Sequence, residues 1–310
     1  MINISQFINV VSKKMKKNKK ALSLKMLSVK KRIKVANPKM FIWLLVPIFA
    51  LVHVTQYFFE KPKTQVLGAS TEEAYIASNT SDPYKRIDNF KYNGLGVASI
   101  IFTGARKNQY DLAYPEVESR GLLAGVSVPV NEVGFIDSMT WLNIKLLQFK
   151  GWEIISQSRD QICDKEKLKD GNILKNETSG SKEDFTRLGI PVNLYLAPCG
   201  ITTSIINKRV QENYKGIVKF GIESNLVSVN NFYSLTIRQV NNTVKIADVQ
   251  SWIKDARVNR KWLIISFPNI DVAQDNNNVT AELLKTTLDE LKKSNLQIAL
   301  PVEILKYDKR

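Results

Sequence analysis

The chain has 310 residues, of which 44% are hydrophobic and 24% charged, and this composition excludes a wholly disordered protein. Its 45 Lys and Arg outnumber its 29 Asp and Glu, which gives a formal net charge of +16. The one histidine, His53, excludes every catalytic or metal site that needs two imidazoles.

The positive charge is concentrated at the amino terminus. Residues 1–39 hold 12 Lys or Arg and no acid, which leaves 33 basic against 29 acidic residues in the rest of the chain. Nucleic-acid binding is the usual interpretation of such an arm. Here the segment that follows explains the charge more simply, and we therefore expect no nucleic-acid partner.

Residues 40–59 form a stretch of 20 residues without Asp, Glu, Lys or Arg. As a helix it would span about 30 Å, the thickness of a bilayer's hydrocarbon core. The basic arm before it predicts that residues 1–39 are cytoplasmic and that the rest of the chain is extracytoplasmic. We therefore predict a single-pass signal anchor that holds the protein in the membrane.

A cleaved signal peptide is the alternative to an anchor, because small residues at 67–70 are of the kind that a signal peptidase accepts. In either case His53 falls inside the apolar segment and is unavailable to the outer part of the chain. Residues 60–91 are rich in Pro, Ser, Thr, Asn and Lys, a composition typical of a linker.

From residue 92 to residue 310, short β-branched apolar runs alternate with amphipathic segments. Buried strands that alternate with helices predict an α/β fold, and seven candidate strands favour a (β/α) barrel with its site after the strand carboxyl ends. The predicted strands are 96–102, 122–130, 152–156, 192–197, 216–220, 261–267 and 297–300. The predicted helices are 140–149, 246–258 and 280–293, and the polar stretch 163–181 is predicted to be an insertion or a long loop.

Cys163 and Cys199 are the only cysteines, and both lie in the predicted outer domain. An oxidising compartment permits a disulfide between them, and their spacing is not that of a zinc site. The sequence leaves open whether they approach closely enough to pair.

Several strings, in this order and spacing, resemble the polysaccharide deacetylase family, the NodB homology domain of carbohydrate esterase family 4. The resemblance covers residues 92–307 and implies an irregular (β/α) barrel that hydrolyses N-acetyl groups on carbohydrates. The strings that carry it are Gly96–Ala105, Gly121–Val130, Met139–Trp141, Gly151–Gln161, Ala197–Gly200 and Trp262–Ile270.

The resemblance implies a definite chemistry. In the family, one Asp and two His hold a divalent metal that polarises the N-acetyl carbonyl and acidifies a water. A second Asp accepts the proton of that water, and a His near the chain end protonates the leaving amine. The two acids belong to a Thr-Phe-Asp-Asp-Gly motif after the first strand, and the metal histidines to a His-Ser/Thr-x-x-His motif after the third.

This chain departs from the family at each of those positions. Glutamine is a poor ligand for Zn²⁺, threonine is no base near pH 7, glycine has no ligand atom, and Arg159 adds positive charge where the metal would bind. We therefore predict a pseudoenzyme with no catalytic residue, no metal and no cofactor. The degenerate positions are Thr103 for the base, Gly104 for the metal carboxylate, Gln157 and Gln161 for the metal histidines, and Pro268 for the late histidine.

The first hypothesis is a membrane-anchored module that binds glycan or serves a structural role in the cell envelope. In this hypothesis four polar residues at the barrel mouth form hydrogen bonds with the glycan. Alternatively, they are polar residues that are tolerated in a pocket that has lost its function. Trp141 and Trp152 would either stack on sugar rings or belong to the core. The candidate substrate-binding residues are Thr103, Gln157, Gln161 and Asn269.

The alternative is an active polysaccharide deacetylase, a hydrolase of carbon–nitrogen bonds other than peptide bonds, with a carboxylate site for Zn²⁺, Mn²⁺ or Mg²⁺. Its candidate ligands are Asp137, Glu153, Asp160 and Asp164. A third hypothesis has no sugar and makes the domain a binding partner of envelope proteins.

Overall fold

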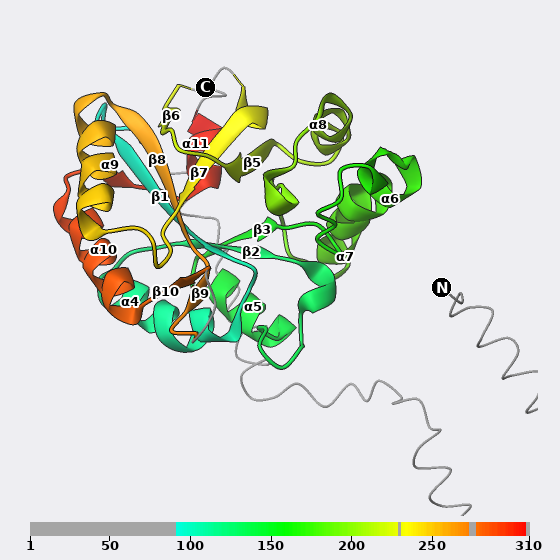
Figure 1. The fold of residues 1–310 in the computed structure, drawn as a ribbon, viewed down its shortest axis with the longest axis horizontal. Coiled ribbons are helices and arrows are strands. Elements are labelled where there is room, and N and C mark those ends of the chain that lie inside the picture. The colour runs from blue at the N-terminus through cyan, green and yellow to red at the C-terminus, as the bar shows by residue number, and fades with distance from the viewer. Residues whose placement is uncertain (1–90, 229–230, 273–276, 308–310) are drawn as a thin grey trace, which may run out of the picture. The chain divides into compact units, whose positions relative to one another are not determined.

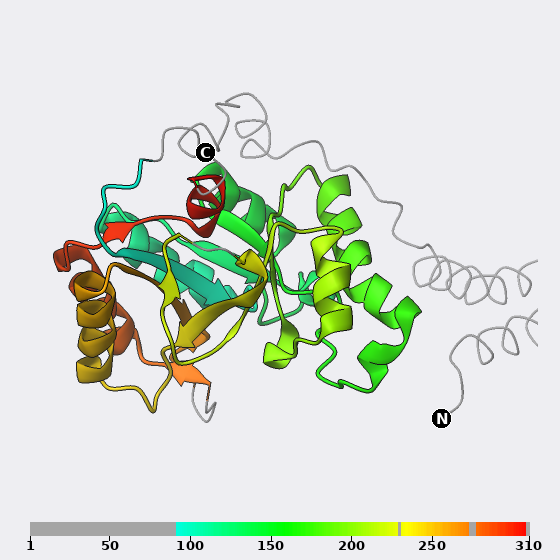
Figure 2. The ribbon, with the colours of Figure 1, turned by 90° about the horizontal axis from the view of Figure 1, so that it is seen from above.

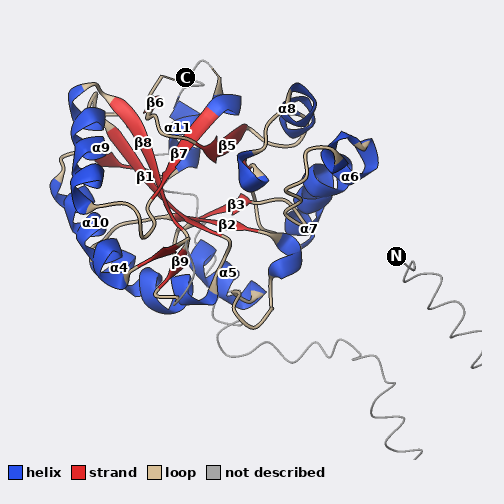
Figure 3. Ribbon diagram, in the orientation of Figure 1, coloured by secondary structure: helices blue, strands red, loops and turns tan. Residues whose placement is uncertain are grey.

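The computed structural model describes residues 91–228, 231–272 and 277–307 (Figure 1). Seven parallel strands form a closed barrel, because the last of them pairs with the first (Figure 3). The predicted (β/α) barrel is therefore confirmed. In their order around the barrel the strands are β1 (Val97–Thr103), β2 (Gly125–Val128), β3 (Glu153–Ser156), β4 (Leu194–Leu196), β5 (Gly216–Phe220), β7 (Leu235–Gln239) and β8 (Lys261–Phe267).

The barrel is irregular at its first strand. One edge of β1 pairs with β8, whereas the other is shared between β2 near its carboxyl end and β11 (Gln297–Ile298) near its amino end. The predicted strand at 297–300 therefore exists but lies outside the ring. The seventh strand of the ring is instead β7, which the sequence pattern did not predict. Its buried residues Leu235 and Ile237 alternate with polar residues, so β7 lacks a continuous apolar run.

Helices cover the outside of the barrel. The predicted helices are confirmed as α5 (Trp141–Phe149), α9 (Ile246–Val258) and α10 (Ala281–Lys293). The hydroxyls of Thr140 and Thr280 accept backbone N–H groups at the starts of α5 and α10, as expected of N-caps. The sequence pattern did not predict α4 (Tyr114–Ser119), α8 (Ser204–Gln211) or α11 (Pro301–Tyr307), which cover further parts of the barrel.

The stretch 163–181, predicted to be an insertion or a long loop, is a loop with one short 3-10 turn only up to Asp170. From Gly171 the chain is helical through α6 (Gly171–Lys175), a π-helical turn (Asn176–Gly180) and α7 (Ser181–Arg187). This helical stretch lies with α8 on the side of the barrel opposite α9 and α10 (Figures 1 and 2). Its buried face mixes apolar with polar side chains, whose hydroxyls donate to carbonyls of the same helix, so no apolar periodicity marked it. That face consists of Leu174, Thr178, Ser181 and Phe185.

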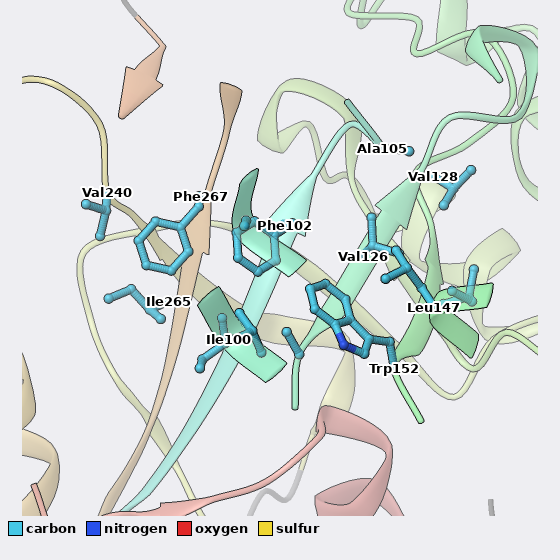
Figure 4. Close-up of a cluster of buried hydrophobic side chains, with 14 of the residues drawn as sticks. Ile100, Phe102, Ala105, Val126, Val128, Leu147, Trp152, Val240, Ile265 and Phe267 are labelled. Carbon is cyan, nitrogen blue, oxygen red and sulfur yellow. The ribbon is translucent and has the colours of Figure 1, made fainter. Parts of the chain in front are cut away.

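The main core packs between the sheet and the helices (Figure 4). The ring of Phe102 stacks on Trp152 and on Phe267, with 5.4 Å between ring centroids in each pair. Burying side chains of this size contributes about 1.5–3 kcal/mol each. Trp152 is only 2% exposed, so the hypothesis that it stacks on sugar is wrong and its role is in the core.

The predicted arm at 1–39, the predicted anchor at 40–59 with His53, and the linker up to residue 90 lie outside the described residues. Within the part of the chain that the structure describes, no helix combines the length and apolarity needed to cross a membrane.

Candidate functional site

The carboxyl ends of β1, β3 and β8 carry the residues at the family's site positions. Thr103 ends β1 and Gly104 follows it, while Gln157 and Gln161 lie in the loop after β3. Pro268 follows β8, and Asn269 begins β9 (Asn269–Ile270), which pairs with β10 (Asn278–Val279).

Five side chains at this mouth form one hydrogen-bonded chain, here called the mouth network. The hydroxyl of Ser127 donates to Oε1 of Gln157 over 2.6 Å, and Nε2 of Gln157 donates to Oε1 of Gln161. Nε2 of Gln161 in turn donates to Oε1 of Glu132. The other oxygen of Glu132 pairs with Nη1 of Arg106 at 3.1 Å. The two glutamines are thus brought together, as the family alignment predicts.

Arg106 lies beside Gly104, the position at which the resemblance implies a metal-binding carboxylate. A Cβ at Gly104 would lie 3.2 Å from Nε of Arg106. The backbone at Gly104 also has a φ of +93°, a conformation that strains residues with a Cβ. The loop after β1 is therefore shaped for glycine and carries a fixed positive charge beside it.

These residues do not fit the divalent metal that the resemblance implies. The mouth network offers two carboxamides, a hydroxyl and one carboxylate that is already paired with a guanidinium, whereas Zn²⁺ prefers imidazole, thiolate and carboxylate ligands. No group of three or more His, Cys, Asp or Glu suited to a metal ion occurs among residues 91–228, 231–272 and 277–307.

Gln109 holds the ends of β1 and β8 together beneath the mouth. Its side chain is fully buried, and its Nε2 donates to the carbonyl of Thr103 over 2.8 Å and to that of Pro268 over 3.0 Å. Its Oε1 accepts the backbone N–H of Arg106 over 3.0 Å. One buried amide therefore positions three residues of the mouth.

The loop after β3 is held from behind by Glu177, which belongs to the π-helical turn. Its carboxylate accepts the backbone N–H of Asp160 over 3.1 Å. Burial raises the pKa of Glu177, and hydrogen bonds from the Asp160 backbone and the Ser158 hydroxyl oppose that shift. Within this loop Ser158 and Gln161 both have positive φ, 64° and 51°. Such strained backbone persists only where the surroundings hold it in place.

The prediction that Arg159 adds charge at the metal position is wrong, because its guanidinium points to the helical stretch. Its Nη2 pairs with Asp184 at 2.6 Å and donates to the carbonyl of Gly180 over 3.0 Å, and its Nη1 donates to Asn176. A Cβ at Gly180 would lie 2.9 Å from Nη1, so a larger residue there would displace the guanidinium. The cation at the mouth is Arg106.

Cys163 and Cys199, whose pairing the sequence left open, form a disulfide with their Cα atoms 5.6 Å apart. Cys163 lies after β3 and Cys199 after β4, so the bond ties two neighbouring loops at the carboxyl end of the barrel.

The four acids of the alternative metal site do not form a site. Glu153 begins β3 and therefore lies at the amino end of the strands, where its Oε2 accepts the N–H of Val302 over 2.9 Å. Burial raises its pKa to about 8. Asp160 accepts from the side chain of Asn131, and Asp164 accepts the N–H groups of residues 166 and 167 as the cap of a turn. The prediction of Glu153 as a metal ligand is thus wrong, because the site is predicted after the carboxyl ends of the strands.

The sequence pattern missed Arg106, Glu132, Ser127 and Gln109. Ser127 belongs to a predicted strand, and the other three follow strand ends within a few residues. A search for polar residues close after a strand would have found Arg106, Gln109 and Glu132. It would not have predicted that the side chain of Arg106 lies beside Gly104.

No protein-family model and no curated protein matches the chain. A structure described as T48 deacetylase with substrate superposes with a TM-score of 0.50 and 10% identity, over 70% of this chain and 95% of the other. The Streptococcus pyogenes deacetylase PplD in complex with acetate gives 0.46 and 14%, over 58% and 83%. The family 4 carbohydrate esterase from Streptomyces lividans in complex with acetate gives 0.44 and 10%, over 66% and 92%. The first of these confirms the predicted resemblance at the level of the fold.

Proposed function

We propose that the chain is a membrane-anchored, extracytoplasmic polysaccharide-deacetylase-like protein that binds a glycan of the cell envelope and lacks metal-dependent deacetylation. The observation that carries this proposal is the position of Arg106 beside Gly104, joined through Glu132 to the two glutamines. We take this internal ion pair to stand where the relatives' chemistry would need a metal and its ligands.

The side chains at the family's catalytic positions support the loss of proton transfer. A guanidinium stays protonated at any physiological pH, and a carboxamide neither gives nor takes a proton in this range. Pro268 has no titratable group with which to protonate a leaving amine. The mouth offers hydrogen bonds and a fixed charge, which favour binding over hydrolysis.

The retained scaffold supports a binding function. The disulfide, the buried carboxylate of Glu177 and the amide of Gln109 hold loops whose backbone is strained at Ser158 and Gln161. Backbone strain of this kind concentrates at binding and catalytic sites. Sugars present hydroxyl and amide groups that such pre-formed polar sites bind.

The test uses the full chain purified in detergent. We expect no acetate release from N-acetylglucosamine oligomers with added Zn²⁺, Mn²⁺ or Mg²⁺, and saturable binding of an oligosaccharide by titration calorimetry. Metal-dependent acetate release that Gln157→Ala abolishes would overturn the loss of catalysis.

The membrane topology has its own test. We expect external protease to digest the domain at 92–310 in cells whose inner membrane is intact, and to leave residues 1–39 protected. Protection of the whole chain would contradict the proposed orientation.

A further inference from the structure

A groove of about 640 Å³ opens beside the barrel mouth. Its walls come from the loops after β2 and β3, from the first residue of α5 and from the helical stretch at 171–188. None of the family's site positions lines it. This groove and the mouth network are therefore separate candidate sites for a ligand.

The mouth network gives a sugar little access to its glutamines. Oε1 of Gln157 accepts from Ser127 and its Nε2 donates to Gln161, while Gln161 also donates to Glu132. Each carboxamide keeps one N–H and one acceptor lone pair, but the network fixes their directions and Gln157 is only 9% exposed. We therefore expect weak binding at this position.

The groove contains a fixed aromatic surface. Trp141, the first residue of α5, lines it and is only partly buried. The buried ring of Phe185 holds the indole in an edge-to-face contact, with 5.9 Å between centroids and an interplanar angle of 83°. A pyranose presents C–H groups on its ring faces, and a rigid indole binds such an apolar face at little entropic cost.

Polar side chains in the groove are oriented but keep unused hydrogen-bonding capacity. Asp160 accepts from the amide groups of Asn131 and Asn176 and so sets the direction of both side chains. Both asparagines line the groove. Since Nδ2 of Asn131 is the donor in its bond, its Oδ1 is left to accept a hydroxyl of a ligand.

The charges in and beside the groove balance. Arg159 and Arg187 line it and both pair with Asp184, which also lines it. Asp160 does not line the groove, but it is hydrogen-bonded to the two lining asparagines and adds a second carboxylate beside them. The side chain of Arg187 is 70% exposed and uses one nitrogen for Asp184, so its other N–H groups remain available. Balanced charge with spare donors and acceptors suits an uncharged, hydroxyl-rich ligand better than an anion.

We infer that this groove, and not the barrel mouth, binds an uncharged saccharide, with a pyranose ring on Trp141 and its hydroxyls on Asn131 and Arg187. The inference deepens the proposed function and rests on it. It names the position of the glycan and its chemical class, neither of which follows from the family's catalytic motifs.

The experiment measures binding of the N-acetylglucosamine tetramer to the full chain in detergent by titration calorimetry. We expect Asn131→Ala and Arg187→Ala each to weaken binding at least fivefold. The matched control is Arg209→Ala, because Arg209 forms the same kind of helical i, i+3 ion pair with Glu212 on α8. Arg209→Ala and Gln157→Ala should change the affinity less than twofold, and far-UV circular dichroism checks that each variant is folded.

Two further measurements sharpen the result. Trp141→Phe keeps an aromatic ring against Phe185, and we expect it to weaken binding and to remove most of the sugar-dependent change in tryptophan fluorescence. The glucosamine tetramer and a galacturonic acid tetramer, which are charged, should bind at least tenfold more weakly than the uncharged tetramer.

Each outcome has a distinct meaning. Loss of binding in Gln157→Ala, with normal binding in Asn131→Ala and Arg187→Ala, would overturn the groove and leave the proposed function intact. Equal or tighter binding of a charged tetramer would overturn the chemical class. No binding of any of the three tetramers by the unaltered chain would contradict the proposed function itself.

Discussion

Nε of Arg106 lies 3.2 Å from the point that a Cβ at Gly104 would occupy, so a side chain at position 104 would crowd Arg106. Arg106 also pairs with Glu132, and Glu132 accepts from Gln161. A carboxylate introduced at position 104 would therefore disturb the mouth network.

Gly104→Asp should destabilise the protein by about 2–4 kcal/mol, because strain at positive φ adds to crowding against Arg106. Gly134→Asp is the matched control, since Gly134 has a similar φ of +88° and nothing within 4 Å of its Cβ position. Strain alone should cost that variant about 1–2 kcal/mol. Urea unfolding measures both, and equal losses would show that Arg106 does not occupy the space.

Substitutions of Glu132 separate its charge from its hydrogen bond. Glu132→Gln keeps an oxygen that can accept from Gln161 and removes the ion pair with Arg106, whose side chain is 33% exposed. Because solvent screens this ion pair, Glu132→Gln should lower the free energy of unfolding by about 0–1 kcal/mol. Glu132→Ala loses both contacts and should lower it by about 1–2 kcal/mol. Only the charge contribution should shrink in 1 M salt. Identical losses for the two variants would contradict the network as described.

Glu177→Ala should release the loop after β3. It leaves the backbone N–H of Asp160 without its buried acceptor, at a cost of about 1–3 kcal/mol. Hydrogen exchange at that amide should accelerate in the variant more than exchange in α9. Unchanged exchange at Asp160 would show that the loop is held by other contacts.

The raised pKa of Glu153 should make the free energy of unfolding depend on pH. Burial raises its pKa to about 8 from the ordinary 4.5 of a glutamate, so the folded state binds a proton that the unfolded state releases. This contribution is complete below pH 4.5 and is lost as pH rises towards 8, by up to about 1.4 kcal/mol per pH unit. Glu153→Gln, which can still accept the N–H of Val302, should flatten the slope and make the protein more stable than the unaltered chain at pH 8.

The control for that slope is Glu183→Gln, which removes an exposed carboxylate on α7. Thermal melting between pH 5 and pH 8 measures all three proteins. A Glu153→Gln variant with the slope of the unaltered chain would contradict the role assigned to this carboxyl group.

The disulfide should contribute measurably to stability. Cys163 and Cys199 are separated by 36 positions, and closing a loop of that length in the unfolded chain is worth about 3–4 kcal/mol. Cys163→Ser with Cys199→Ser should lower the free energy of unfolding by that order and weaken saccharide binding only slightly. A thiol reagent applied to the denatured protein without reductant should label no cysteine, and labelling would contradict the bond.

The parts of the fold that were predictable have strong apolar patterns. The bounds of α9 and β8 agree with the prediction because their buried residues follow the helical period or form a continuous apolar run. The helical stretch from Gly171 was missed because Thr178 and Ser181 are buried through hydrogen bonds instead of apolarity. The strand β7 was missed because Thr236 and Arg238 interrupt its buried residues.

The site was predictable only in part. The spacing of four between Gln157 and Gln161 puts both in one short loop, and their side chains contact each other there. It assigned the cation at the mouth to Arg159, because the direction of a long side chain depends on distant partners such as Asp184. The pairing of Arg106 with Glu132 joins two loops, and no local pattern in the sequence encodes it.

The position of β11 beside β1 has a consequence for how this domain forms during synthesis. Ser99 in the first strand donates to the carbonyl of Ala299, and the carboxyl of Glu153 needs the N–H of Val302. A nascent chain therefore cannot complete the pairing of β1 until residues 297–302 have left the ribosome. Domains dominated by such distant contacts fold slowly and leave unpaired strand edges exposed for longer.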